Sequence, residues 1–221
     1  KIASREAIAD LIRRARGQIE NHRFSASFIM TEWEQVVDAW QLHTWEDYQS
    51  VLRLGRKIRL PEDKRKVLWS IFEIVRKGLK DEELLTFANM YERLTQYYQA
   101  ENRSPFDFFV VDESQDISIA QLKFLGTLGG NQPDSLFFAG DLGQRIFQQP
   151  FSWKTLGVDI RSRSHTLIIN YRTSNQIRMH ADKLLGPEIT DVDGVTELRA
   201  GTISVFNGPD PIINTFNSEI E

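Results

Sequence analysis

Three carboxylates and a carboxamide follow an apolar run near the middle of the chain: Asp112, Glu113, Gln115 and Asp116 come directly after Phe-Phe-Val-Val at 108–111. The apolar run predicts a buried strand of a parallel sheet, apolar on both faces. Open α/β sheets bind ligands at the carboxyl ends of such strands. Two adjacent carboxylates there suit a nucleotide site, where one holds Mg²⁺ through water and the next orients or deprotonates an attacking water. The alternative from these residues alone is a solvated acidic turn after a core strand.

Two later segments repeat this pattern of an apolar run that ends in polar residues. Residues 135–139 run into Gly140 and Asp141, and residues 166–169 run into Asn-Tyr-Arg-Thr at 170–173. Because parallel strands end at one edge of a sheet, we expect these polar ends to lie together. The repetition favours one shared site over three independent turns.

The segments at 112–116 (Asp-Glu-Ser-Gln-Asp), 140–147 (Gly-Asp-Leu-Gly-Gln-Arg-Ile-Phe) and 170–173 resemble, in order and spacing, three motifs of UvrD/Rep-type DNA helicases of superfamily one. The resemblance rests on residues 105–180 and extends without clear motifs over 1–104, where those helicases insert a helical subdomain. It implies an ATP hydrolase that couples Mg-ATP hydrolysis to movement on DNA or to its unwinding. The implied cofactors are ATP and Mg²⁺, and the implied partner is single-stranded or partly duplex DNA.

The resemblance assigns roles to the polar residues after the first two strands. Asp112 would hold the Mg²⁺ of bound ATP, and Glu113 would be the base that activates the hydrolytic water. Gln115 resembles the amide that couples the nucleotide to neighbouring motifs, with Asp116 as its structural support. Asp141 belongs to the same group of nucleotide-binding residues.

Further residues of the implied site come later in the chain. Gln144 would sense the γ-phosphate, Tyr171 would stack on adenine, and Arg172 resembles an arginine finger from a second motor domain. Such a finger offsets charge on the transferring phosphoryl group and raises rates roughly 10³–10⁵-fold in NTPases. The resembled helicases also stack aromatic rings on single-stranded bases, for which Phe147 and Trp153 are the candidates here. The aromatic-Arg-Gly sequence usual at this point in the family is not present.

The chain also departs from the resembled family because no G-x-x-x-x-G-K-[S/T] sequence occurs in its 221 residues. A phosphate-binding loop needs those glycines for close backbone approach and the lysine for charge at the β and γ phosphates. The nearest approximation, Gly-Arg-Lys at 55–57, lacks the upstream glycine and the hydroxyl. The family's last arginine motif is missing as well, and residues 212–216 resemble a strand without its neighbours. We therefore expect a fragment of a longer helicase that does not hydrolyse ATP by itself.

The composition excludes several classes of protein. The chain has 41% apolar residues, no cysteine and a net charge of −4, which permits a sizeable core but excludes disulfides, cysteine-bound zinc and a generic polycation. No apolar run approaches the length of a membrane span and no signal-peptide pattern opens the sequence, so a cytoplasmic protein without membrane contact is expected. A basic run at 53–66 could contact DNA phosphates through Arg56, Lys57 and Arg59, the alternative being a solvated surface.

The first hundred residues have the apolar spacing of helices. Stripes at 8–19, 68–75 and 87–98 each keep a helical period, and aromatic residues on such stripes are expected in a core. Helix starts are predicted at Thr31, Thr44 and Pro61. The first of these would be a capping box formed by Thr31 and Glu34.

The second half alternates strands and helices, which predicts a parallel α/β sheet. Capping boxes that begin at Ser118 and Thr173 predict two helices, the second ended by Gly-Pro at 186–187. Residues 188–201 are expected to form an exposed loop.

Together with the resemblance, these patterns predict an α/β protein in which a helical subdomain is followed by part of a parallel-sheet RecA-like P-loop NTPase motor domain and the start of a second one. The expected boundaries are 1–104 for the helical inserted subdomain, 105–165 for the second half of the first motor domain and 166–221 for the truncated start of the second.

Two classes of function stay open. The first is a motor, the piece of an ATP-dependent DNA helicase or translocase that carries the residues named above. The second is a helicase-like protein without catalysis that acts as a binding or regulatory module, for example beside a nuclease or a toxin–antitoxin partner. Glu113, Gln144 and Arg172 favour the motor, because a site that had lost catalysis would be free to lose them.

Overall fold

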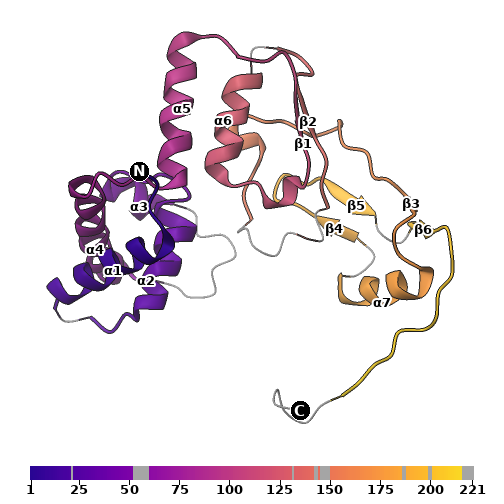
Figure 1. Cartoon of the computed structure of the whole chain (residues 1–221), viewed down its shortest axis with the longest axis horizontal. Coiled ribbons are helices and arrows are strands. Elements are labelled where there is room, and N and C mark those ends of the chain that lie inside the picture. Colours follow the sequence, from indigo (N-terminus) through magenta and orange to yellow (C-terminus); the bar gives the residue numbers. More distant parts are fainter. Residues whose placement is uncertain are drawn as a thin grey trace. The chain divides into compact units, whose positions relative to one another are not determined.

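The computed structural model describes residues 1–20, 22–51, 60–130, 132–141, 144, 150–185, 188–198 and 201–215. The chain divides into two compact units, the first made of Lys1–Asp141 and Arg145–Asp159 and the second of Leu142–Gln144 and Ile160–Glu221. The first unit holds several helices and the second holds the described helix α7, and each has a parallel pair of strands of its own (Figure 1). Among the described residues, no helix has both the length and the apolar character needed to cross a membrane.

The first unit begins with a block of helices, coloured indigo to purple in Figure 1. We call these elements the helical block: α1 (Arg5–Gln18), α2 (Ala26–Glu32), the π-helical turn η1 (Trp33–Val37), α3 (Trp45–Ser50) and α4 (Glu62–Asp81). The apolar stripes of α1 and α4 pack against each other in one core, as their helical period predicts. Trp33, Tyr48 and Phe72 are buried at its centre, with the ring of Phe72 in contact with the other two.

Two of the predicted helix starts in this block are confirmed. Thr44 caps α3 through a reciprocal pair of hydrogen bonds with Asp47, and Pro61 directly precedes α4. The apolar stripe at 68–75 is buried in the core, as predicted.

The predicted helix start at Thr31 is wrong. Helix α2 begins earlier, because the hydroxyl of Ser25 accepts the N–H of Phe28 (3.1 Å) and caps the helix there. Thr31 therefore lies inside the helix, where its own hydroxyl donates to the carbonyl of Ser27 (2.8 Å).

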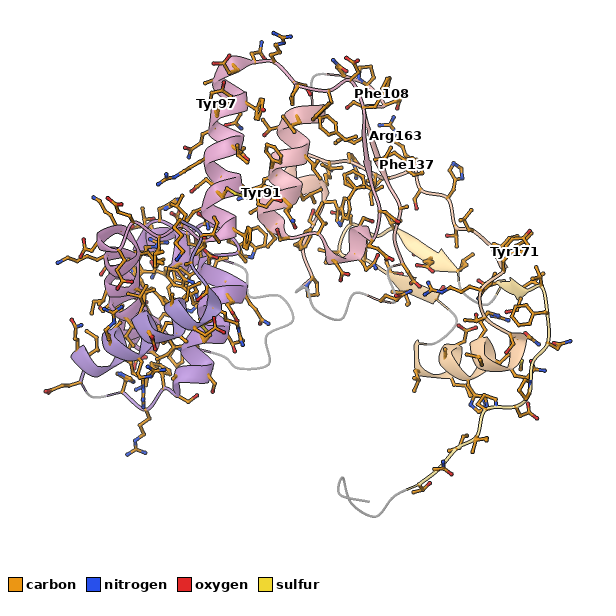
Figure 2. All side chains as sticks on the ribbon, in the orientation of Figure 1. Tyr91, Tyr97, Phe108, Phe137, Arg163 and Tyr171 are labelled. Carbon is orange, nitrogen blue, oxygen red and sulfur yellow. The ribbon has the colours of Figure 1, made fainter. Side chains whose placement is uncertain are left out.

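Helix α5 (Phe87–Glu101) leads from the helical block towards the strands and lies beside α6 (Ile119–Gly129) (Figure 1). The expectation of a core stripe is only partly met, because none of the residues of α5 is fully buried. Tyr91 and Tyr98 pack against Phe124 of α6, with ring centroids 5.6 and 6.1 Å apart. The two helices are therefore joined by one aromatic cluster, on the side of α5 where Figure 2 labels Tyr91.

Strands β1 (Phe109–Val111) and β2 (Leu136–Phe138) form a parallel pair, with α6 as the connection between them. The reciprocal hydrogen bonds of Ser118 and Gln121 cap α6, so the predicted capping box is confirmed. The 3-10 turns η2 (Ser114–Asp116) and η4 (Lys154–Leu156) complete this part of the first unit.

The prediction that β1 is buried on both faces is wrong for the described residues. Phe109, Val111 and their partners on β2 are partly buried, because α6 and the ring of Trp153 cover that face. On the other face Val110 is 76% exposed and Phe137, labelled in Figure 2, is 63% exposed. The sheet is thus covered on one side only.

The second unit contains β3 (Ile169–Asn170) paired in parallel with β6 (Ile203–Ser204), and helix α7 (Asn175–Leu185). The hydroxyl of Ser174 accepts the N–H of Ile177 (3.5 Å), so α7 is capped one residue later than predicted. The expected end of this helix at 186–187 lies outside the described residues.

Residues 188–198 form an antiparallel hairpin, which corrects the prediction of a loop. Strand β4 (Glu188–Thr190) pairs with β5 (Thr196–Leu198). The side chain of Asp191 holds the turn, because Oδ1 accepts the N–H groups of Asp193 (2.9 Å) and Val195 (2.8 Å).

Two expectations about the strands are not met. The ends of β1 and β2 share one sheet edge, but β3 pairs with β6 in a different sheet, so the three predicted strand ends do not share one sheet. Residues 211–215 are not part of a strand, and Ile212 is 89% exposed. The described residues thus form a mixed α/β structure with small parallel sheets.

Candidate functional site

The loops that follow β1 and β2 are joined by backbone hydrogen bonds at the carboxyl edge of the strand pair. The N–H of Ala139 donates to the carbonyl of Val111, and the N–H of Ser114 donates to the carbonyl of Ala139, both at 2.8 Å. The acidic segment 112–116 and the segment Gly140-Asp141 therefore meet, as the parallel pairing predicts.

The side chain of Gln115 connects these two loops. Its Nε2 donates to Oε2 of Glu113 at 2.7 Å, and its Oε1 accepts the backbone N–H of Asp141 at 3.1 Å. Gln115 is buried, whereas Glu113 is exposed. The amide thus fixes one oxygen of the carboxylate and leaves the other, Oε1, without a hydrogen bond among the described residues.

Glu113 has a left-handed backbone conformation, with φ 51° and ψ 41°. Such a conformation costs a non-glycine residue roughly 1–3 kcal/mol and persists only where the surroundings enforce it. Here the enforcement comes from the N–H of Ser114, which donates to the carbonyl of Ala139 just after β2, and from the N–H of Asp116, which donates to the carbonyl of Glu113 (3.0 Å). The carboxylate is therefore held by a strained turn that both strands support.

Gly140 is required by the close approach of the two loops. A Cβ atom at this position would lie 2.7 Å from Oε1 and 3.1 Å from the backbone nitrogen of Gln115, and it would also collide with the hydroxyl of Ser114. Ser114 and Gln115 are buried, so they have little room to move. The glycine lets the second loop reach the buried amide.

The side chain of Asp112 suits a metal ion that binds together with a nucleotide. Its Oδ1 accepts the N–H of Glu113 at 2.9 Å, and the side chain is exposed at the edge of the strand pair. The described residues contain no group of three or more His, Cys, Asp or Glu side chains that could hold a metal ion. Mg²⁺ in nucleotide sites uses one or two carboxylates together with phosphate oxygens and water, so one carboxylate here is enough.

A second set of predicted residues follows β3. Oδ1 of Asn170 accepts the N–H groups of Arg172 (2.8 Å) and Thr173 (3.2 Å), which is an Asx turn. Its Nδ2 donates to the hydroxyl of Thr173. The turn leaves the side chains of Tyr171, labelled in Figure 2, and Arg172 exposed, with Tyr171 at 73%.

Trp153 does not fit the predicted role of stacking on DNA bases. Its ring is buried and contacts Phe138 of β2 edge to face, with centroids 4.8 Å apart, and stacks with Phe151. A ring in this position contributes to the core beside the strand pair. In this structure its face is not available to a base.

The remaining candidate residues are Gln144 and four residues outside the described part of the chain. Gln144 is exposed and groups with the second unit, so its role as a γ-phosphate sensor stays a prediction. Arg56, Lys57, Arg59 and Phe147 lie outside the described residues.

Sequence reasoning missed two residues that organise these loops. The motif gives Ser114 no role of its own, although its backbone N–H donates to Ala139 just after β2 and its hydroxyl lies beside Gly140. Asn170 was given no role, although asparagine at a strand end is a known turn former and could have been recognised as one.

A protein-family model matches more than half of the chain. The model described as UvrD/REP helicase N-terminal domain matches residues 1–153. The matched range contains the helical block, α5, both strands of the first sheet and the loops at their ends. No curated protein matches the sequence.

Proposed function

The chain belongs to the UvrD/REP helicase N-terminal domain family, and on that premise we propose that it supplies part of the ATPase site of a DNA helicase. In this proposal, hydrolysis of Mg-ATP drives movement along single-stranded or partly duplex DNA, or its unwinding. The phosphate-binding loop, which the 221 residues lack, comes from sequence outside them. Residues 105–165 then complete the first motor domain, 166–221 begin the second, and 1–104 form the inserted helical subdomain.

The observation that carries this proposal is the position of Glu113. A carboxylate at the carboxyl edge of a parallel strand pair, held through one oxygen by the buried amide of Gln115, is oriented for work at its other oxygen. A solvated acidic turn would not need a buried amide that also bonds to the loop after β2. This arrangement supports a general base rather than a surface turn.

The proposed chemistry uses the two carboxylates differently. Asp112 would bind Mg²⁺, which supplies charge neutralisation at the phosphates. Glu113 would accept a proton at Oε1 from a water molecule as the water oxygen bonds to the γ-phosphorus and the bond to the leaving ADP oxygen breaks. The hydrogen bond from Gln115 would hold Glu113 in place throughout and connect the reaction to Asp141 on the next loop.

The turn after β3 would supply the remaining contacts with the nucleotide. Tyr171 would stack on adenine, and Arg172 would offset charge that develops on the transferring phosphoryl group. Gln144 would sense the γ-phosphate. The Asx turn of Asn170 supports the roles of Tyr171 and Arg172, because both side chains are exposed on it.

The test replaces Glu113 in a protein that contains this sequence together with a phosphate-binding loop. Glu113→Gln keeps the size of the side chain and removes the base, so single-turnover hydrolysis should fall about 10²–10⁴-fold. Nucleotide affinity should be retained. Asp107→Asn is the matched control, because Asp107 is an exposed carboxylate just before β1 and should leave hydrolysis unchanged.

Two further variants separate binding from chemistry. Arg172→Ala should slow hydrolysis and spare nucleotide binding, because a finger acts on charge in the transition state. Tyr171→Ala should weaken nucleotide affinity more than it slows the bound complex. Equal hydrolysis by wild type and Glu113→Gln, or no ATP binding by either, would overturn the motor and leave a binding or regulatory module. The 221-residue chain alone should not hydrolyse ATP.

A further inference from the structure

A short segment after β6, residues 205–208, bonds to both ends of the Asx turn that follows β3. At one end of the turn, the N–H of Val205 donates to the carbonyl of Asn170 at 3.1 Å, which continues the parallel pairing of β3 and β6. At the other end, the carbonyl of Phe206 accepts the N–H of Asn175, the first residue of α7, at 3.1 Å. We call residues 205–208 the support segment; it lies in the same unit as β3 and α7 (Figure 1).

The side chain of Gln176, in the first turn of α7, adds a third bond to the support segment. Its Oε1 accepts the backbone N–H of Gly208 at 2.8 Å, across 32 positions of the chain. Because the donor is a backbone nitrogen, the amide must present its oxygen to it. The capping box predicted from Thr173 would have turned this side chain back onto the helix start. Gln176 instead connects the start of α7 to a distant segment.

Gly208 allows the support segment to approach the start of α7 closely. A Cβ atom at this position would lie 2.9 Å from both Cβ and Oγ of Ser174. Ser174 is buried and its hydroxyl caps α7, so it has little room to move. The bond between Gly208 and Gln176 therefore needs a residue without a side chain at position 208.

The side chains of Tyr171 and Arg172 depend on the backbone of the turn for their position. Both are exposed, so packing does not fix them. The backbone of the turn is in turn held at both ends by the support segment. A displacement of about 1 Å in a group that acts on a reacting centre can lower a rate about 10²-fold. A loosened support segment would therefore affect whatever these two side chains contact.

We propose that Gln176 is a positioning residue, which holds the support segment at Gly208 and thereby fixes the turn that presents two side chains to the nucleotide. Those side chains are Tyr171 and Arg172, so the inference rests on the function proposed above. It extends the site to a segment outside the motif at 170–173. Loss of the bond leaves both side chains chemically intact and changes only how firmly they are held.

The first test follows amide hydrogen exchange in the 221-residue chain by ¹⁵N–¹H NMR, without nucleotide. Gln176→Ala removes the acceptor, so the N–H groups of Arg172 and Thr173, which bond to Asn170, should exchange about three- to tenfold faster. Gln176→Glu keeps an acceptor oxygen at the same place and should restore slow exchange. Lys183→Ala is the control, because Lys183 is exposed on the same helix.

A second variant reaches the same bond from its other end. Gly208→Ala places a Cβ against Ser174, which should push the support segment away and speed exchange in the turn about three- to tenfold. Gly201→Ala is the matched control, because a Cβ there meets no atom within 4 Å. Gly208→Ala decides the matter if Gln176→Ala does not fold.

The second test measures ATP affinity and single-turnover hydrolysis in a protein that contains this sequence together with a phosphate-binding loop. A misplaced turn disturbs Tyr171 and Arg172 together, so Gln176→Ala should weaken the affinity and lower the rate of the bound complex, each about three- to tenfold. Gln176→Glu should restore both quantities. A residue with a merely structural role would lower the unfolding temperature and leave both quantities unchanged in the folded protein.

Two results would overturn the inference and leave the helicase proposal standing. One is unchanged exchange at Arg172 and Thr173 in both Gln176→Ala and Gly208→Ala. The other is unchanged ATP affinity and hydrolysis in Gln176→Ala while Tyr171→Ala and Arg172→Ala show their expected effects. If those last two variants change neither quantity, the proposed function of the turn is wrong and the inference fails with it.

Discussion

Gln115 accepts the backbone N–H of Asp141 through its side-chain oxygen at 3.1 Å, although the two residues lie 26 positions apart in the chain. The nitrogen of the same amide donates to Glu113, so the candidate base and the loop after β2 share one buried side chain. A displacement of either loop must therefore break or stretch a hydrogen bond of this amide. The uncharged amide of Gln115 therefore connects the loops at the ends of β1 and β2.

Removal of this amide should destabilise the first unit. Gln115→Ala removes this acceptor of the Asp141 N–H and leaves a buried gap, which should lower the free energy of unfolding by about 1–3 kcal/mol. Gln132→Ala is the control, because this glutamine is exposed and should change stability by less than about 0.5 kcal/mol. Urea unfolding followed by circular dichroism measures both, and equal losses would contradict the structural role of Gln115.

Gly140→Ala should be destabilising for a steric reason. The new Cβ would collide with Ser114 and lie 2.7 Å from Oε1 of Gln115, so the loops must move apart, at a cost of roughly 1–3 kcal/mol. Gly17→Ala in α1 is the matched control, because a Cβ there meets no atom within 4 Å. Alanine in a helix is favoured over glycine by roughly 0.5–1 kcal/mol, so this control should be stabilising. Thermal unfolding of the two variants should therefore shift in opposite directions.

Local patterns in the sequence predicted the fold where one short segment determines the structure. The reciprocal caps at Thr44 and Ser118 need only four residues in a row, and both are present. Thr31 has the same spacing but lies inside α2, because the cap formed by Ser25 starts the helix first. A capping box therefore marks a helix start only where no earlier cap competes with it.

Features that depend on distant residues could not be predicted in this way. The hydrogen bond between Gln115 and Asp141 and the burial of Trp153 against Phe138 both require two segments to meet. The hairpin at 188–198 was missed because its strands are three residues each and mostly exposed, which leaves no apolar alternation to detect. The meeting of the polar segments after β1 and β2 could be predicted from the parallel pairing, whereas the hydrogen bonds that hold them together could not.

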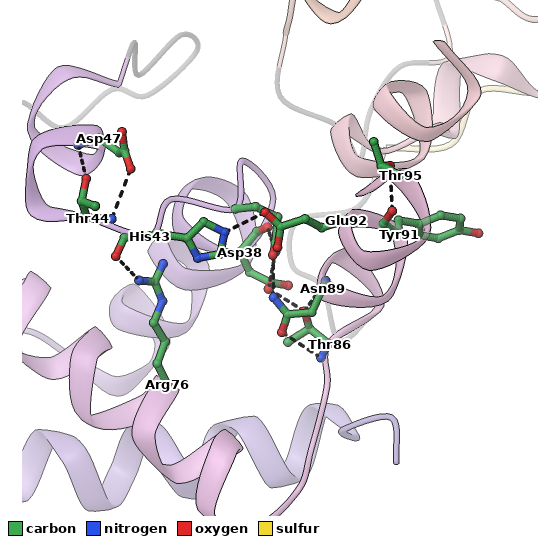
Figure 3. Close-up of polar contacts among 11 residues, drawn as sticks. Asp38, His43, Thr44, Asp47, Arg76, Thr86, Asn89, Tyr91, Glu92 and Thr95 are labelled. Carbon is green, nitrogen blue, oxygen red and sulfur yellow. Dashed lines mark hydrogen bonds and ion pairs between the residues drawn. The ribbon is translucent and has the colours of Figure 1, made fainter. Parts of the chain in front are cut away.

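Thr86, the N-cap residue of α5, should contribute more to the free energy of unfolding than Thr95 within the same helix. Its hydroxyl caps the helix by accepting the N–H of Asn89 (3.1 Å) and donates to Asp38 of the helical block (2.6 Å) (Figure 3). Thr86→Val keeps the shape and removes both bonds, which should cost about 1–2 kcal/mol in unfolding free energy. Thr95→Val is the control, because Thr95 only donates to the carbonyl of Tyr91 within the helix and should cost less than about 0.5 kcal/mol. Equal costs in urea unfolding would show that the link between α5 and the block is not energetically important.

Asp38 should make the stability of the first unit depend on pH. Burial raises its pKa above the ordinary value of 3.8, and the hydrogen bonds from Thr86 and Gln41 offset this only in part. The folded chain therefore keeps the proton on Asp38 to a higher pH than the unfolded chain does. The contribution of this group to stability is fully present below the unfolded pKa and is lost as the pH rises through the folded pKa.

Asp38→Asn should remove this dependence, because the amide is neutral at every pH and its oxygen can still accept the hydrogen bond from Thr86. The stability of the variant relative to wild type should therefore increase from pH 4 upwards and level off above the folded pKa of Asp38. Urea unfolding between pH 4 and pH 8 measures the difference, with Asp107→Asn, at an exposed position, as the control that should give a flat difference. A difference for Asp38→Asn that is flat, or that falls as the pH rises, would mean that the buried carboxylate is stabilised in its charged form, because the hydrogen bonds and the nearby Arg76 would then outweigh burial.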